Sequence, residues 1–216
     1  SLFDSMCHTF TTLPTGGFST KNASIAHFDS LYIDAVIIFF MLMAGINFSL
    51  HFQLFKGKPL ALWRDSECRF YLAAVLILTG IVSFNIYGSV YNGIGEALRY
   101  GAFQVVSIIT TTGYATADYE MWPAMSQLIL LLCMFIGASA GSTGGGMKCL
   151  RIMLCFKYSY KELFSMIHPR AVMRIKIGGK PVPERLQAIA TQVGLIILLL
   201  FMTFVVVIDV LKVTGH

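Results

Sequence analysis

Two short segments rich in threonine and glycine carry the residue types needed to coordinate a cation through backbone carbonyls. They form two sets of three residues, each followed by an aromatic residue and 96 positions apart: Thr15, Gly16 and Gly17, then Thr111, Thr112 and Gly113. A cation that leaves water needs oxygen ligands, and a strand whose carbonyls turn to one side supplies them. Glycine permits the backbone dihedral angles involved. We therefore predict two potassium-filter strands.

A second candidate site is a glycine-rich string with a lysine just after it: Ser139, Ala140, Gly141, Ser142, Thr143, Gly144, Gly145, Gly146 and Lys148. Each glycine lowers helix propensity by about 1 kcal/mol relative to alanine, so three in succession predict unwound backbone. One interpretation is an intramembrane loop that blocks or opens the pore. The other is close helix packing through small residues spaced four apart, beginning at Gly137. Lys148 is a functional candidate at the inner edge of the membrane, or extends its stem to the surface.

The elements that must position these sites belong to an integral membrane protein. Hydrophobic residues make up 56% of the chain and charged residues 12%, and the mean hydropathy is +0.72. Since a membrane-spanning helix needs about 20 apolar residues, we predict spans in residues 31–55, 70–91 and 186–211, and a glycine-broken span in residues 124–156. Residues 2–13 and 97–109 are too short to span. We expect re-entrant half-helices there, with the negative ends of their dipoles toward the ion path.

The net charge of +5 follows membrane topology rather than nucleic-acid binding. Of the 16 lysines and arginines, four lie in residues 56–69 and nine in residues 148–185, after the inner ends of apolar segments. By the positive-inside rule these connections are cytoplasmic, so both threonine–glycine segments lie toward the outside. A docking surface for a cytoplasmic partner or for anionic lipid is the alternative role of the basic residues.

The 96-residue repeat predicts an all-α polytopic membrane protein with repeated helix–pore loop–helix units around a central ion pore. Residues 1–55 form a pore-loop unit without its first helix, and residues 56–69 a cytoplasmic connection. Residues 70–156 form a complete unit with a broken second helix. A basic cytoplasmic connection, residues 157–185, leads to the first helix of another unit in residues 186–216.

Three motifs, residues 14–20, 110–114 and 141–148, together resemble the Trk/Ktr/HKT superfamily of potassium transporters, and within it the bacterial TrkH-type membrane subunit. Residues 44–48 followed by His51 also resemble that family. The resemblance covers essentially the whole chain and implies four units in one protein. On that map the sequence starts in the second pore loop, contains the third unit and ends before the fourth pore loop. The resemblance also implies a gating loop at residues 141–148.

The resemblance implies potassium uptake across the bacterial inner membrane by a lipid-embedded homodimer with a cytoplasmic nucleotide-binding regulatory subunit of the TrkA type. We expect no catalytic residue and no cofactor besides the transported ion. Channel-like flux and symport coupled to protons or sodium both fit. One alternative is an alternating-access carrier of a small solute. Another is a rhomboid-like intramembrane serine protease with Ser139 as nucleophile, although residues 186–211 contain no histidine to serve it.

Overall fold

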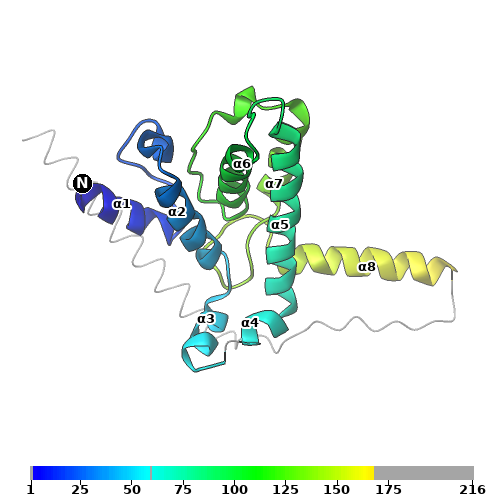
Figure 1. Ribbon diagram of the computed structural model, residues 1–216. Coiled ribbons are helices and arrows are strands. Elements are labelled where there is room, and N and C mark those ends of the chain that lie inside the picture. Colours follow the sequence, from blue (N-terminus) through cyan, green and yellow to red (C-terminus); the bar gives the residue numbers. More distant parts are fainter. Residues whose placement is uncertain (1, 59, 168–216) are drawn as a thin grey trace, which may run out of the picture. The chain divides into compact units, whose positions relative to one another are not determined.

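The computed structural model of this protein describes residues 2–58 and 60–167, and these residues form helices joined by loops (Figure 1). The predicted span at residues 186–211 and most of the basic connection lie outside the described residues. The helices, in chain order, are α1 (Leu2–Thr12), η1 (Ser24–Phe28), α2 (Leu31–Ala44), α3 (Phe48–Phe55), α4 (Leu60–Arg64), α5 (Ser66–Ile86), α6 (Ile94–Ile109), η2 (Tyr119–Met121), α7 (Ala124–Phe135) and α8 (Cys149–Ile167).

Helix α5 is the described helix that is long and apolar enough to cross a bilayer by itself. It corresponds to the predicted span at residues 70–91. Asp65 caps its N-terminus by accepting a hydrogen bond from the Cys68 amide at 2.7 Å. Its exposed surface carries large apolar side chains such as Leu76 and Phe84, which suits contact with hydrocarbon.

The two predicted half-helices are present as α1 and α6. Helix α6 packs against α2, α5 and α7, and Figure 1 shows it with α2 on one side and α5 and α7 on the other. Most of its C-terminal half is buried, including Phe103 and Ile109. A helix too short to span the membrane needs such a protein environment, because its ends would otherwise face hydrocarbon.

A buried ion pair fixes α6 to α2. The Arg99 Nε donates to Asp34 Oδ2 at 2.6 Å, and Arg99 also lies 3.2 Å from the Asp29 carboxylate. Asp34 is 1% exposed, so removing its partner would leave an uncompensated buried charge. The pair joins the second helix of one repeat to the half-helix of the next.

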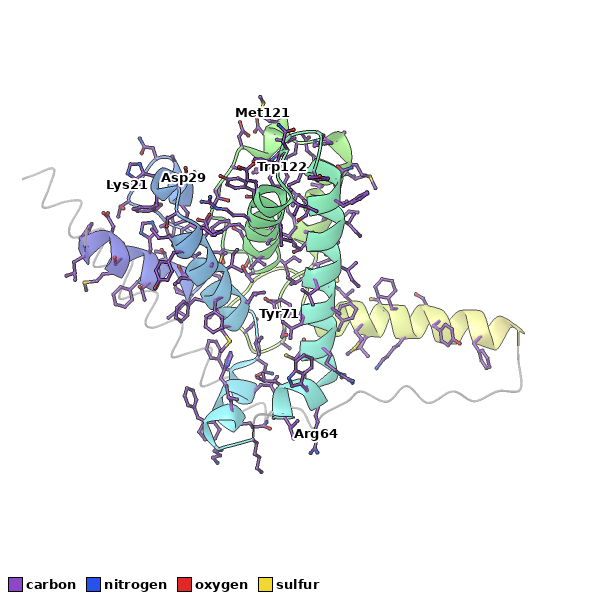
Figure 2. The ribbon with its side chains drawn as sticks, viewed as in Figure 1. Lys21, Asp29, Arg64, Tyr71, Met121 and Trp122 are labelled. Carbon is purple, nitrogen blue, oxygen red and sulfur yellow. The ribbon has the colours of Figure 1, made fainter. Side chains whose placement is uncertain are left out.

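Residues from loops predicted to be external and residues from a connection predicted to be cytoplasmic lie at opposite ends of the described structure. Figure 2 shows Lys21, Asp29, Met121 and Trp122 at one end and Arg64 at the other, with Tyr71 between them. Arg64 belongs to the connection predicted to be cytoplasmic, and the other four belong to loops predicted to be external. The division of the chain into repeat units and connections, with boundaries after residues 55, 69, 156 and 185, remains a prediction.

The segment predicted to span the membrane over residues 31–55 is not one continuous helix. Helices α2 and α3 meet at an angle of 101°, with a break at residues 45–47. Asn47 caps α3 by accepting a hydrogen bond from the Ser49 amide at 2.8 Å. Hydropathy registers that residues 31–55 are apolar, but it is insensitive to a cap and to backbone partners supplied from a distant segment.

The predicted break in residues 124–156 is confirmed. Helix α7 ends at Phe135 and α8 begins at Cys149, and residues 136–148, called here the glycine-rich loop, contain no helix. The helix-packing interpretation therefore does not apply, since the small residues do not share a helix face. Helix α8 continues to Ile167, beyond the end of the predicted apolar segment.

We predict that Gly45→Ala destabilises the fold by about 1–3 kcal/mol through overpacking. A Cβ at Gly45 would overlap the Tyr71 hydroxyl and lie 2.8 Å from its Cζ, while the Gly45 φ of −76° carries no strain. The measurement is the melting temperature of purified protein. Gly80→Ala is the matched control, because among the described residues nothing lies within 4 Å of a Cβ there.

Adding Tyr71→Phe to Gly45→Ala removes the overlapping hydroxyl and should restore part of the lost stability. Equal melting temperatures for Gly45→Ala and Gly80→Ala would contradict the proposed close contact.

Candidate functional site

Each predicted filter strand leaves the C-terminal end of a half-helix and bonds back to it through its amides. After α1, the Thr15 amide donates to Thr12 O at 3.1 Å, and the Gly16 and Gly17 amides donate to Thr11 O at 2.8 and 3.2 Å. All three N–H groups of this strand therefore point toward the half-helix.

The second strand repeats these bonds 96 residues later. After α6, the Thr111 amide donates to Ile108 O at 2.9 Å, and the Thr112 and Gly113 amides donate to Ser107 O at 2.9 and 3.3 Å. The corresponding distances in the two strands agree within 0.2 Å. The repeat in the sequence is thus a repeat in backbone geometry.

Both strands alternate into the left-handed region of backbone conformation. The φ angles are 57° at Thr15 and 68° at Gly17, and 59° at Thr111 and 81° at Gly113. Sequence reasoning expected this conformation only at the glycines. A β-branched residue with positive φ is a true outlier, and such strain is concentrated at functional sites. Each threonine is held in this conformation by the hydrogen bonds that its own amide and the next amide donate to the half-helix.

The carbonyls of these six residues form no hydrogen bond with any described residue. All six amides are occupied, so the two strands are polarised, with N–H groups toward the half-helices and C=O groups unpaired. A carbonyl away from water needs a partner, and water or a cation can supply it. This arrangement fits the predicted oxygen lining of an ion path.

A hydroxyl group holds the residue after each filter glycine. Thr11 Oγ1 donates to Phe18 O at 2.8 Å, and the equivalent Ser107 Oγ donates to Tyr114 O at 2.7 Å. These bonds tie each strand to its half-helix at a fourth point. Neither hydroxyl was singled out from the sequence, although Thr11 and Ser107 are also related by the 96-residue spacing.

The two strands lie side by side and are linked through Tyr114. Its buried hydroxyl lies 2.5 Å from Thr11 Oγ1 and 3.3 Å from His8 O, both on α1. In addition, a Cβ at Gly17 would overlap the Thr112 carbonyl, so only glycine fits at this approach. One strand therefore packs directly against the half-helix and strand of the other repeat.

The glycine-rich loop is closed at its base. Residues Ile136 and Met147 form a bridge, and the Gly137 amide donates to Met147 O at 2.9 Å. The two limbs touch so closely that a Cβ at Gly137 would overlap Gly145 O. The loop is thus a compact element rather than a stretched linker.

The loop contacts both predicted filter strands at their start. Thr143 Oγ1 donates to Leu13 O at 2.9 Å, just before the first strand. The Gly145 amide donates to Thr111 Oγ1 at 2.6 Å in the second strand, and the Thr15 hydroxyl lies 3.2 Å from Thr143 O. The predicted gate and the predicted filter are therefore in direct contact.

The loop also supplies the backbone partners that the break between α2 and α3 needs. The Ser139 amide donates to Gly45 O at 3.0 Å, and the Phe48 amide donates to Gly141 O at 3.1 Å. Two interrupted helices thus satisfy each other's backbone groups. The sequence signal was the alignment of residues 44–45 with residues 140–141 in the repeat.

Two charged side chains hold the loop from within the protein. The Lys148 ammonium donates to Gly144 O, so it is turned into the loop instead of toward the surface. Glu67, on α5, accepts hydrogen bonds from the Ala140 amide at 2.7 Å and the Leu150 amide at 3.1 Å. Sequence reasoning missed Glu67, and the available signal was an acidic residue at the start of a spanning helix.

The protease alternative finds no base beside Ser139. The Ser139 Oγ is buried and has no hydrogen-bond partner among the described residues. Its amide serves the α2–α3 break instead. A serine nucleophile needs a general base within hydrogen-bonding reach, which the described part of the chain does not provide.

The described residues form an all-α fold with two repeated units, each a half-helix followed by a short extended strand. The family model for TrkH, described as a cation transport protein, matches residues 1–216. The chain belongs to the TrkH family.

Named relatives and a solved structure agree with this assignment. The chain is 44% identical over 190 residues to the Trk system potassium uptake protein TrkH of Escherichia coli K12, covering 85% of this chain and 38% of the relative. It is 42% identical over 186 residues to the same protein of Salmonella typhimurium, with equal coverage. The crystal structure of the potassium transporter TrkH from Vibrio parahaemolyticus matches with a TM-score of 0.80 and 38% identity, covering 86% of this chain and 41% of that one. The chain spans about two fifths of the length of these relatives.

We predict that Tyr114→Phe loosens the link between the two strands and lowers stability by about 1–3 kcal/mol, because Thr11 Oγ1 and His8 O lose a buried partner. The measurement is the melting temperature of the full-length protein in detergent. Tyr32→Phe is the matched control, since Tyr32 is 77% exposed. Equal melting temperatures for the Tyr114→Phe and Tyr32→Phe variants would show that the Tyr114 hydroxyl contributes nothing to stability.

Proposed function

We propose that this chain forms part of a potassium uptake pathway and lines it with the carbonyls of Thr15, Gly16, Gly17, Thr111, Thr112 and Gly113. The observation that carries the proposal is the polarity of the two strands. Every amide is bonded to a half-helix, while no carbonyl is bonded to a described residue. The relatives named as Trk system potassium uptake proteins support potassium as the ion.

The mechanism is the exchange of water for carbonyl oxygens. A potassium ion entering between the strands loses hydration and gains ligands that are already oriented, so little reorganisation is needed. The C-terminal ends of α1 and α6 add the negative ends of two helix dipoles. Two strands line part of the ion's surroundings, and further strands from the rest of the protein would complete it.

The glycine-rich loop would act as the gate. Supporting this role, Thr143 and Gly145 contact the start of both strands, where an ion leaving them would pass. The loop residues Ser139 to Gly146 carry small side chains, so displacement of the loop would open space. Unwound backbone at this depth is tolerated where protein or a water-filled cavity satisfies it.

We also propose a membrane location and partners for this protein. The proposal places the chain in a bacterial inner membrane, as a homodimer whose basic connection, residues 157–185, faces the cytoplasm and meets a nucleotide-binding regulatory subunit of the TrkA type. Support comes from the positive-inside distribution of lysine and arginine, and from the relatives' description as components of a Trk system.

We predict that Gly17→Ser and Gly113→Ser reduce potassium preference over sodium roughly tenfold, because a left-handed residue with a Cβ costs about 1–2 kcal/mol and shifts the adjacent carbonyls. Gly17→Ser should have the larger effect, since its Cβ would also displace the Thr112 carbonyl. The measurement is the ratio of potassium to sodium flux in proteoliposomes holding the full-length protein.

The matched control for this pair is Gly88→Ser. Gly88 has φ 77° and lies in the exposed turn after α5, so the variant carries the same backbone strain outside the strands. Unchanged selectivity in both Gly17→Ser and Gly113→Ser would remove the filter assignment.

We predict that deleting residues 144–146 raises potassium flux per folded protein without abolishing selectivity, because the deletion removes the Gly145 contact to Thr111 and shortens the loop. Deleting residues 88–90, in the outer turn, is a control of equal length. Uptake is measured together with the amount of monodisperse protein. A folded loop-deletion variant with unchanged or lower flux would count against the gate.

A further inference from the structure

Glu67 occupies a position that a carboxylate rarely holds without a specific role. It lies in the first turn of the spanning helix α5 and is 8% exposed. Burying an ionised carboxylate is costly unless hydrogen bonds and an opposite charge compensate for it. The partners of Glu67 therefore indicate what the residue does.

A single oxygen of Glu67 binds both ends of the glycine-rich loop region. Oε1 accepts a hydrogen bond from the Ala140 amide at 2.7 Å, in the first part of the loop, and one from the Leu150 amide at 3.1 Å, in the first turn of α8. The first amides of a helix have no partner within the helix, and a negative charge is favourable at that end. The carboxylate thus stabilises the start of α8 and the loop together.

Lys148 completes the arrangement from the other limb. Its ammonium donates to Gly144 O, one residue before the Gly145 amide that binds Thr111. Glu67 and Lys148 also attract each other electrostatically. Two opposite charges therefore hold the two limbs of the loop, one at Ala140 and one at Gly144.

We infer that Glu67 and Lys148 form a charged latch that holds the glycine-rich loop against the filter strands, with Glu67 acting as a positioning residue. This inference rests on the gate assignment under the proposed function. Because the same oxygen binds Ala140 and Leu150, a displacement of α8 that breaks one bond also weakens the other. The latch thereby couples the start of α8 to the loop.

The test uses full-length protein carrying Ser142→Cys, a reporter in the loop, in detergent and in proteoliposomes. N-ethylmaleimide reaction at residue 142 is followed by mass spectrometry, so that native cysteines do not interfere. Glu67→Gln keeps the shape of the side chain and removes its charge, and Lys148→Met removes the other charge. Each should raise the reaction rate about tenfold, the factor expected when a charge-assisted hydrogen bond of 1.4 kcal/mol is lost.

Two further variants separate a latch from general destabilisation. The double variant Glu67→Gln with Lys148→Met should raise the reaction rate by less than the product of the two single increases, because the two charges attract each other and each single substitution already removes that attraction. Glu120→Gln, an exposed glutamate in the outer loop, should leave the rate unchanged. Lys148→Met, at the edge of the loop, provides the measurement if Glu67→Gln yields little folded protein.

Potassium flux in the same preparations distinguishes failure of the latch from failure of the gate. Faster reaction together with higher flux supports both. Faster reaction with unchanged flux supports the latch and removes the gate assignment. An unchanged reaction rate at residue 142 in the folded single variants overturns the latch, whatever the flux.

Discussion

The structure depends on one constraint: backbone polar groups inside a membrane must find partners within the protein. Continuous helices meet it locally, but this chain interrupts two helices at comparable positions in its repeat. The carbonyl of Gly45 accepts from the Ser139 amide, and the amide of Phe48 donates to Gly141 O. The break between α2 and α3 and the loop between α7 and α8 are therefore a single structural unit. Each interruption supplies a backbone hydrogen-bond partner to the other.

The predicted filter strands use the same constraint in a different way. Their amides are satisfied by the ends of α1 and α6, and their carbonyls are bonded to none of the described residues. Holding Thr15 and Thr111 at positive φ costs free energy, which the repeated amide bonds offset. In the proposed filter these carbonyls are available to a cation, because the amides of the same strands are already bonded to the half-helices. A cation can then replace water as their partner without rearrangement of the backbone.

The few buried or partly buried charged side chains lie where separate elements of the fold meet. Arg99 and Asp34 connect two repeats, while Glu67 and Lys148 hold the two limbs of the glycine-rich loop. A buried ion pair such as Arg99–Asp34 adds little to stability on balance, but losing one partner is severe. Glu67 and Lys148 bind backbone groups instead, and both kinds of contact favour one arrangement of the helices and loops over its alternatives. That property suits a scaffold for the proposed filter and for the gate that we propose in the glycine-rich loop.

The sequence alone determined the membrane character, the half-helices, the break in the helix at residues 137–146 and the family, because hydropathy, glycine content and repeat spacing can be read from the sequence without the fold. It also singled out Gly17 and Gly113, whose dihedral angles follow from the absence of a Cβ. Only the tertiary structure revealed the break at Gly45, the strained Thr15 and Thr111, and the buried Glu67. Each of these depends on a hydrogen-bond partner far away in the chain. A local sequence pattern contains no information about such distant partners, so these three features were determined by tertiary packing.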